Sequence, residues 1–446
     1  MTDGSGAIGD GPEDLRGRRV TVLGLGRFGG GVGVTRWLVG QGAIVTVSDS
    51  ASPETLGASV EQLAGLDVTL HLGGHDEADL TEADLLVVNP AIPPDAPMVI
   101  SAEQAGVPWT TEINLFLQRC PCRWVGITGS VGKSTTTAMA GAILERRFTT
   151  HVGGNIGVSL LNSLPEMGLG DIAVLELSSF QLESLPKVGL SPAVALVTNL
   201  APNHLDRHGD MACYAAAKKN IFRFQGADDV LILNREDESL RNWASQARGR
   251  VEWFDTSGES FALGVPGVHN QSNAQAAWTI ARCLGVSRED AAKGLELFAG
   301  LPHRLQRVAW RRGVTYYNDS KCTTPRGAIV ALQAFDPRSA VMIVGGYDKG
   351  VSFDELAAEL VARAKAILVI GETAEKIAAA VEEARKDQDQ PRLAVCGNLA
   401  EAVAKADEIA TPGDAVLLSP ACASYDQFTN YEQRGERFVE LVRGSA

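Results

Sequence analysis

The sequence predicts an α/β protein built from three domains in series. The chain has 446 residues, a length that suits about three domains of ~150 residues each. Short apolar runs alternate with alanine-rich helical patterns along almost the whole chain, and such alternation indicates parallel sheets covered by helices. Two of the apolar runs lead directly into glycine-rich turns, at residues 24–29 and 129–133.

The first domain is expected at residues 18–111, with a Rossmann-like fold. A strand at 19–23 enters Gly24-x-Gly26-x-x-Gly29, and a second strand ends at Asp49, twenty residues later. This is the spacing of a dinucleotide-binding turn and its acidic ribose partner. Residues 1–17 are rich in glycine and acidic residues and lack periodicity, so we expect a disordered tail.

The central domain, expected at residues 112–301, carries the second glycine turn. Residues 126–137 read Gly-Ile-Thr-Gly-Ser-Val-Gly-Lys-Ser-Thr-Thr-Thr. A strand, a glycine loop and a helix N-terminus form a nest of backbone N–H groups that suits a polyphosphate. The strict Walker A pattern fails at Ile127, but the shorter form Gly129-x-x-Gly132-Lys133-Ser134 fits. We therefore predict a P-loop ATPase domain with a mainly parallel sheet.

Three other polar residues of this domain are candidates for the site. Glu176 ends an apolar strand, as the acidic residue of a Walker B strand does, and could bind Mg²⁺. His204 follows the next strand, but Mg²⁺ prefers oxygen ligands, so a structural role stays equally open. The helical pattern alone places Lys218 on a solvated helix face.

The third domain, expected at residues 302–446, repeats the Rossmann-like alternation. Polar motifs follow its apolar strands at 318–321, 345–350 and 419–424. Each could be ordinary turn chemistry, but together they indicate a ligand site at the carboxyl edge of a sheet. The His269-Asn-x-x-Asn273 motif opens a helix, where its amides could hold an adenine or cap the helix.

Composition excludes several classes of protein. The formal net charge of −14 argues against general nucleic-acid binding. No apolar run reaches the ~18 residues of a membrane helix, and the N-terminus lacks a signal-peptide pattern. The seven cysteines show no paired CxxC spacing, which favours a reduced cytoplasmic protein over a disulfide or zinc protein. We expect a monomer.

The order of the motifs resembles the ATP-dependent Mur ligases of peptidoglycan synthesis, over nearly the whole chain after the tail. The matching stretches are Gly129–Thr135, Gly153-Gly-Asn155, Glu176-Leu-Ser-Ser-Phe, His204-Leu-Asp-Arg-His, Leu301-Pro-His-Arg, Asn318-Asp-Ser-Lys and residues 418–428. The stretches at 318–321 and 418–428 are similar to the branch that adds D-glutamate. The Asp-Asn-Pro-Arg signature of the diaminopimelate-adding branch is absent.

This resemblance implies a two-stage reaction. ATP would phosphorylate the terminal carboxylate of UDP-N-acetylmuramoyl-L-alanine, and the amine of D-glutamate would then displace phosphate. The first domain would hold the UDP end rather than NAD, the central domain ATP, and the third domain the amino acid. Both stages gather negative charge, so the site needs cations, with two Mg²⁺ ions implied.

The resemblance also implies a role for each matching residue. The catalytic residues would be Lys133, Lys218, His204 and Asn155. ATP would contact Gly129, Ser130, Val131, Gly132, Lys133, Ser134, Thr135, Asn270, Asn273, Arg304 and Asp319. The UDP substrate would contact Gly26, Arg27, Phe28, Asp49, Ala91, Asn155 and Ser178. D-Glutamate would contact Lys321, Thr323, Lys349, Ser424 and Tyr431. The metal ligands would be Ser134, Thr135, Glu176, His204 and Lys218, the last as a carbamate.

Several positions depart from the family pattern. Ser130-Val131 replaces Thr-Asn, Arg27-Phe28 replaces a pair that usually includes a small hydroxyl residue, Ala91 replaces glycine, and Tyr431 replaces phenylalanine. Other interpretations are another Mur-type or folylpolyglutamate-type ligase, an NAD-dependent oxidoreductase, and a nucleotide-gated binding protein without catalysis.

Overall fold

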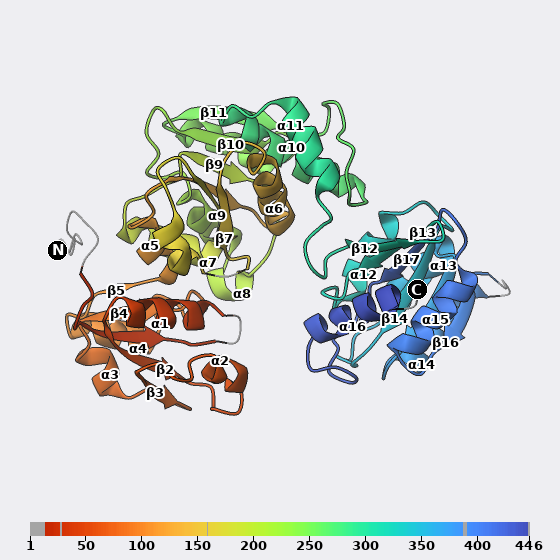
Figure 1. Cartoon of the computed structure of the whole chain (residues 1–446), viewed down its shortest axis with the longest axis horizontal. Helices are drawn as coiled ribbons and strands as arrows, with labels where there is room; N and C mark the ends of the chain where they lie inside the picture. The colour runs from red at the N-terminus through yellow and green to blue at the C-terminus, as the bar shows by residue number, and fades with distance from the viewer. Residues whose placement is uncertain (1–13, 27–28, 158, 387–389, 445–446) are drawn as a thin grey trace. The chain divides into compact units, whose positions relative to one another are not determined.

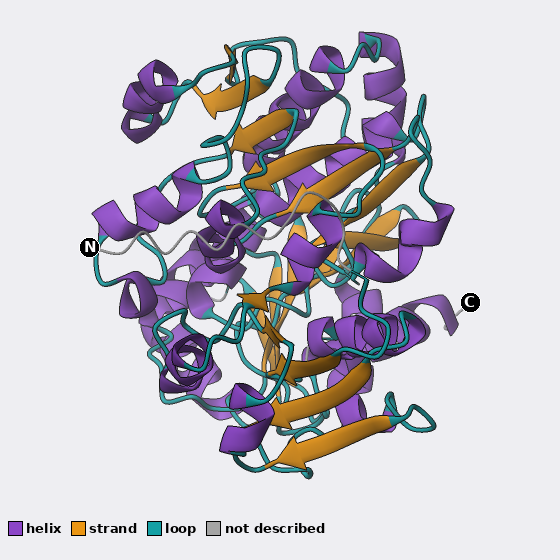
Figure 2. Ribbon diagram, turned by 90° about the vertical axis from the view of Figure 1, so that its left-hand side faces the viewer, coloured by secondary structure: helices purple, strands orange, loops and turns teal. Residues whose placement is uncertain are grey.

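The computed structural model of the chain describes residues 14–26, 29–157, 159–386 and 390–444 (Figure 1). It divides into two compact units, residues 1–258 with 275–291, and residues 259–274 with 292–446. The first unit holds two β-sheets and the second holds one. Figure 2 shows the strands of the sheets lying between helices, which confirms the α/β class. None of the helices in the described ranges is long and apolar enough to span a membrane.

The first sheet has the Rossmann-like form that the sequence predicts. Its strand order is β3-β2-β1-β4-β5, and all neighbours are parallel. The strands are β1 (Arg19–Leu23), β2 (Ile44–Asp49), β3 (Val68–Leu72), β4 (Leu85–Val88) and β5 (Trp109–Thr110), and the helices are α1 (Gly30–Gly40), α2 (Gly57–Glu61), α3 (Glu77–Thr81) and α4 (Pro97–Gln104). Of the expected tail, residues 1–13 lie outside the described residues, whereas Leu15 is buried in the core.

The second sheet is parallel throughout, with the order β11-β10-β9-β6-β8-β7. The strands are β6 (Arg123–Thr128), β7 (Thr150–Gly154), β8 (Ile172–Glu176), β9 (Val194–Val197), β10 (Val230–Asn234) and β11 (Arg250–Phe254). The helices of this part are α5 (Glu112–Leu117), α6 (Lys133–Leu144), α7 (Ser179–Ser184), α8 (Leu205–His208), α9 (Met211–Lys219), α10 (Val268–Cys283) and α11 (Arg288–Leu297). After β6 the chain first forms β7 and β8 on one side of β6 and then β9, β10 and β11 on the other side. The loop after β6 therefore lies at the point where the strand order reverses, which is where open α/β sheets bind ligands.

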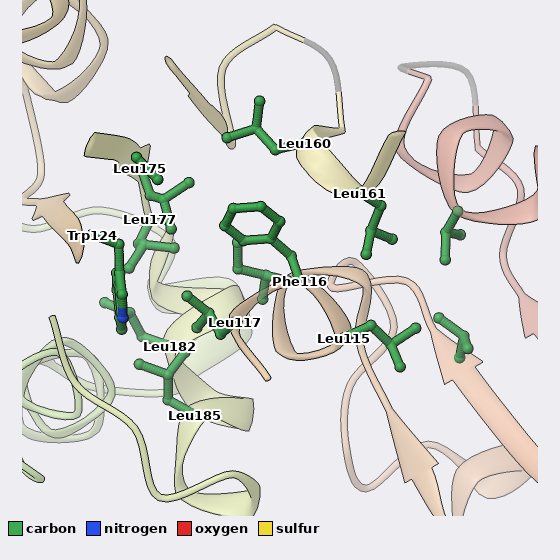
Figure 3. Packing of buried hydrophobic residues seen from close by; sticks show 14 of the residues in the cluster. Leu115, Phe116, Leu117, Trp124, Leu160, Leu161, Leu175, Leu177, Leu182 and Leu185 are labelled. Atoms are coloured by element: carbon green, nitrogen blue, oxygen red, sulfur yellow. The ribbon is translucent and has the colours of Figure 1, made fainter. Parts of the chain in front are cut away.

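One hydrophobic core joins the first two sheets. Buried residues of both belong to a single cluster, and the side chains of α5 lie within it. Figure 3 shows Phe116 between Leu160 and Leu161 and the leucines that follow β8, and Phe116 is fully buried. The two sheets of the first unit are therefore held by shared apolar packing.

The third sheet is mixed, with the order β12-β13-β17-β14-β15-β16. Its strands are β12 (Gln306–Arg311), β13 (Val314–Asn318), β14 (Ala340–Gly345), β15 (Ala366–Ile370), β16 (Arg392–Val395) and β17 (Ala415–Leu418). Its helices are α12 (Pro325–Gln333), α13 (Asp354–Arg363), α14 (Ala374–Arg385), α15 (Leu399–Ile409) and α16 (Tyr431–Gly444). Only the β12–β13 pair is antiparallel among the described strand pairs. The remaining strands keep the parallel arrangement expected of a Rossmann-like domain.

Candidate active site

The phosphate-binding loop connects β6 to α6. Gly129 has φ +146° and Gly132 has φ +85°, and a Cβ on Gly129 would lie 1.9 Å from Thr198 Oγ1. Only glycine fits at position 129, because both the space and the backbone angle exclude a side chain. Lys133 opens α6 and donates to Gly129 O and Ser130 O, at 3.0 Å each. Ser134 and Thr135 follow in the first turn, half-buried.

The loop is held by the segment that follows β9. Val131 N donates to Asn199 Oδ1 at 2.9 Å, and Asn199 Nδ2 returns a bond to Val131 O at 2.9 Å. Thr198 Oγ1 also donates to Val131 O, at 2.7 Å. The Val131 side chain is 68% exposed. The loss of a polar side chain at this position therefore leaves the loop anchored through its peptide groups. Sequence reasoning missed Thr198 and Asn199, whose one signal was a polar pair at a strand end.

The Ser130 side chain faces the protein. Its hydroxyl donates to Ala201 O at 2.8 Å, accepts from Ala201 N at 2.9 Å, and lies 3.1 Å from the Tyr214 hydroxyl. Ser130 is buried. Its hydroxyl thus anchors the loop to the segment before His204 and to α9.

Glu176 is a buried carboxylate with one unsatisfied oxygen. It ends β8 next to β6 and is 2% exposed. Oε1 accepts from Asn155 Nδ2 at 2.8 Å, whereas Oε2 has no hydrogen-bond partner among the described residues. An unpaired buried carboxylate oxygen is unfavourable, and a divalent cation would satisfy it.

The donors present fit Mg²⁺ rather than a metal with an all-protein cage. Within the described ranges, no group of three or more His, Cys, Asp or Glu side chains could hold a metal ion. Mg²⁺ commonly binds through one or two carboxylates while phosphate oxygens and water complete its shell. Glu176 beside a phosphate loop matches that arrangement.

Lys218 lies in the interior of this site, so its expected place on a solvated helix face is wrong. It is 1% exposed; its Nζ donates to Gly129 O at 2.9 Å and contacts Thr128 Oγ1 at 3.4 Å. Burial and the Lys133 ammonium lower the pKa of the Lys218 amine to about 7, against the pull of Glu176. A substantial share of this amine is neutral, and hence nucleophilic, near neutral pH.

His204 lies within electrostatic reach of both lysines. Its backbone is left-handed, with φ 54°, at the start of α8, and its ring packs edge-on against Phe180, with centroids 5.1 Å apart. Partial burial and the Lys133 ammonium lower the pKa of its imidazole. The ring is therefore neutral near pH 7 and retains a free lone pair for a ligand.

A cavity of about 270 Å³ lies in the first unit beside the first glycine turn. Gly26, Ala91, Asn155 and Ser178, all expected at the UDP substrate, line it. Ala91 is not among the residues with positive φ, so alanine replaces glycine there without backbone strain. Arg27 and Phe28 lie outside the described residues.

Asp49 does not line this cavity. Its carboxylate accepts from Gly26 N at 3.1 Å and from Ala51 N at 2.8 Å, so it braces the glycine turn. Sequence reasoning missed Glu112 on the cavity wall, whose carboxylate accepts from Ser159 Oγ at 2.5 Å. Burial raises the pKa of the Glu112 carboxyl.

In the second unit, Asp319 directly follows β13 and its side chain is buried. Its carboxylate accepts from Ser419 Oγ at 2.7 Å and from Leu305 N at 3.1 Å. Burial raises the pKa of this carboxyl to about 6, against the bonds from Ser419 and Leu305. Arg304 is exposed nearby.

The two asparagines expected at ATP lie at the start of α10. Asn270 bonds to Pro266 O and Asn273, at 2.6 and 3.1 Å. The contact of these four expected ATP residues with nucleotide stays a prediction.

Four of the residues expected at D-glutamate lie on strand-end loops of the same unit, and the fifth, Tyr431, opens α16. Lys321 is exposed, with its Nζ 5.2 Å from the Tyr431 ring centroid. Lys349 is exposed and Thr323 half-buried. Ser424 is 1% exposed, and its Oγ has no hydrogen-bond partner in the part of the chain that the structure describes. A buried hydroxyl without a partner is available to a ligand.

Family comparison matches all three parts of the chain. Residues 18–111 match the Mur ligase MurD-like N-terminal domain, residues 127–260 the Mur ligase middle domain, and residues 303–422 the Mur ligase glutamate ligase domain. The chain belongs to the Mur ligase family. This membership decides against the oxidoreductase interpretation of the first glycine turn.

Among Mur ligases, the chain is similar to curated proteins over almost its full length. It is 39% identical to UDP-N-acetylmuramoylalanine–D-glutamate ligase from Roseiflexus sp., over 96% of this chain and 99% of the relative. It is 41% identical to the enzyme of the same name from Anaeromyxobacter dehalogenans, over 97% of this chain and 99% of the relative.

Solved Mur ligase structures share the fold. UDP-N-acetylmuramate-alanine ligase from Thermotoga maritima aligns with a TM-score of 0.60 at 19% identity, over 96% of this chain and all of that one. MurF from Acinetobacter baumannii aligns with a TM-score of 0.58 at 21% identity, over 94% of this chain and 93% of that one. At these identities the likeness concerns the fold alone.

Proposed function

We propose that the chain catalyses the ATP-dependent addition of D-glutamate to UDP-N-acetylmuramoyl-L-alanine in peptidoglycan precursor synthesis. One observation carries this proposal: the phosphate loop, Glu176 and Lys218 lie together at the carboxyl ends of neighbouring strands. The chain that holds them matches D-glutamate ligases over nearly their whole length. The enzyme acts as a cytoplasmic monomer on these three small molecules, without nucleic acid or membrane.

In the first stage, an oxygen of the substrate's terminal carboxylate attacks the γ-phosphorus of ATP. An acyl phosphate forms and ADP leaves. Lys133 exchanges its bonds to Gly129 O and Ser130 O for phosphate oxygens, and its charge stabilises the transferring group. Asn155 holds the Glu176 carboxylate and orients it toward the loop.

In the second stage, the amine of D-glutamate attacks the acyl carbon, its extra proton passes to solvent, and the carbon–oxygen bond to phosphate breaks. Lys321 and Lys349 supply the cations that two carboxylates require. Thr323, Tyr431 and the Ser424 hydroxyl, which has no hydrogen-bond partner among the described residues, complete the amino-acid site.

Two Mg²⁺ ions would be held by Glu176, His204, the Ser134 or Thr135 hydroxyl, and Lys218 as a carbamate. When bound, they would neutralise charge on the transferring phosphoryl group. The neutral amine of Lys218 is the form that adds to carbon dioxide, and its lowered pKa supports that modification.

The domains divide the substrates between them. Residues 18–111 bind the UDP end through Gly26, Arg27, Phe28 and Ala91, Asp49 braces the turn, and Ser178 of the central domain contributes. Residues 112–301 bind ATP, and residues 302–446 bind the amino acid.

An oxygen-transfer experiment tests the chemistry. Substrate carrying ¹⁸O in its terminal carboxylate is incubated with ATP and D-glutamate, and the released phosphate is analysed by mass spectrometry. The acyl-phosphate route places one ¹⁸O atom in each phosphate. Unlabelled phosphate would exclude attack by the carboxylate and hence the proposed reaction.

A further inference from the structure

Arg434, in the first turn of α16, is a buried arginine that has no carboxylate partner among the described residues. It is 1% exposed and is the largest of the fully buried side chains among the described residues. Among the described residues, none of its bonds goes to a carboxylate. Its guanidinium donates to Ser320 Oγ at 3.0 Å, Ser320 O at 2.9 Å, Cys422 O at 3.0 Å and Ala423 O at 3.1 Å. Buried arginines are usually paired with an acid.

These acceptors lie in loops that carry the expected amino-acid ligands. Ser320 precedes Lys321, and Ala423 precedes Ser424. Ala423 O also accepts from Tyr347 N at 3.0 Å, which ties in the loop that carries Lys349. One guanidinium therefore bonds two strand-end loops directly, and Ala423 O links the third loop to them.

The guanidinium also remains charged. Burial lowers the pKa of Arg434 to about 10, still well above neutral pH. Asp426 acts on Arg434 through its charge, but the hydrogen bond that its carboxylate accepts comes from Glu372 N, at 3.0 Å. A buried charge without a counter-ion acts over a longer range than a solvated one, because little water screens it.

We propose that Arg434 is the positioning residue of the amino-acid site, which fixes the three loops and supplies the buried positive charge that favours a dicarboxylate amino acid. This inference rests on the proposed function and names a residue that acts through the loops. Lysine cannot replace it, because an ammonium lacks the planar fork that reaches four acceptors in two loops.

The test compares Arg434→Lys with Arg437→Lys in steady-state assays. Arg437 lies on the same helix, is exposed, and pairs with Glu440 at 2.9 Å. Because several bonds from a charged donor are lost, Arg434→Lys should raise KM for D-glutamate at least about tenfold. KM for ATP and for the nucleotide substrate should stay within about twofold, and Arg437→Lys should leave all three unchanged.

A KM for D-glutamate that stays unchanged in folded Arg434→Lys, or a parallel rise of all three constants, overturns the inference. Should Arg434→Lys fail to fold, Ser320→Ala decides: it removes one acceptor and should raise KM for D-glutamate a few-fold, and no change overturns the inference. Wild-type enzyme that does not use D-glutamate refutes the proposed function itself, and with it this inference.

Discussion

At the scale of the residue, the site contains two buried ionisable groups that the polypeptide alone satisfies poorly. Glu176 has a carboxylate oxygen without a hydrogen-bond partner among the described residues, and Lys218 has an amine whose pKa burial and Lys133 lower to about 7. Both groups lie against the phosphate loop or the strand beside it. The free site is therefore less stable than an equivalent apolar core, and it gains stability when charged ligands bind.

Replacing Glu176 by Gln should separate the cost of burying its charge from the stability that the site gains when charged ligands bind. Glutamine keeps the acceptor for Asn155 and removes the buried charge, so the free energy of unfolding in EDTA should rise by about 1–2 kcal/mol. The added stability from Mg²⁺ with ATP should disappear. Thermal unfolding with and without these ligands measures both quantities.

Glu183→Gln is the matched control for this change. Glu183 is paired with Arg207 at 3.1 Å and with His208 at 3.3 Å, so its neutralisation should destabilise the protein and leave the ligand effect intact. If Glu176→Gln is less stable than wild type in EDTA, the claim that the buried Glu176 carboxylate destabilises the ligand-free protein is contradicted.

Lys218 makes stability depend on pH. Between its folded pKa of about 7 and its unfolded pKa of about 10.4, the unfolded chain holds a proton that the folded chain lacks. The free energy of unfolding contributed by this group should therefore rise with pH across that window. Urea unfolding from pH 6.5 to 9.5 without bicarbonate measures the slope, which Lys218→Met should reduce. Lys219→Met should keep the wild-type slope; equal slopes for wild type and Lys218→Met would refute the buried amine.

At the scale of the element, the loop after β6 depends on the segment after β9. Asn199 bonds both peptide groups of Val131, and Thr198 adds a third bond. The carboxyl ends of adjacent strands β6 and β9 are thus linked at the position where phosphate is expected to bind. Loop geometry here is set by tertiary contacts as well as by its glycines.

Asn199→Ala should weaken ATP binding about tenfold, because it removes two hydrogen bonds of the loop and leaves Val131 N without its acceptor, while Val131 O keeps only the bond from Thr198. Titration calorimetry with ATP measures the affinity. Asn242→Ala, at an exposed position, should bind as wild type does. Undiminished ATP affinity in Asn199→Ala would show that the loop holds its shape without this clamp.

These contacts explain what the sequence could and could not predict. The glycine turns and Glu176 were predictable because their signals are local: a strand followed by a fixed spacing. The burial of Lys218 and the clamp by Asn199 could not be predicted, because both depend on the phosphate loop, which is distant in the chain. Lys218 contacts a loop residue 89 positions away, and Asn199 contacts one 68 positions away. The antiparallel β12–β13 pair was missed too, since the alternation of strands and helices predicts parallel neighbours only.

At the scale of the whole molecule, the two compact units do not follow the boundary expected at residue 301. Residues 259–274 belong to the second unit, whereas residues 275–291 belong to the first, so α10 and α11 each contribute to both. The first unit contains two sheets with a shared core, and we propose that the nucleotide substrate binds within it.

This division should be visible in unfolding. Calorimetry should resolve two transitions, because each unit has its own hydrophobic cores. The UDP substrate should raise the melting temperature of one transition, since a ligand stabilises the unit that it binds. A single transition, or equal shifts of both, would contradict two separately folding units.

The most direct measurement of the central claim is phosphate release from ATP in the presence of UDP-N-acetylmuramoyl-L-alanine and one amino acid at a time. The account predicts release with D-glutamate well above that with L-glutamate or with diaminopimelate, and none in Lys133→Ala. Equal stimulation by L- and D-glutamate, or by neither, would contradict the assignment of D-glutamate as the substrate.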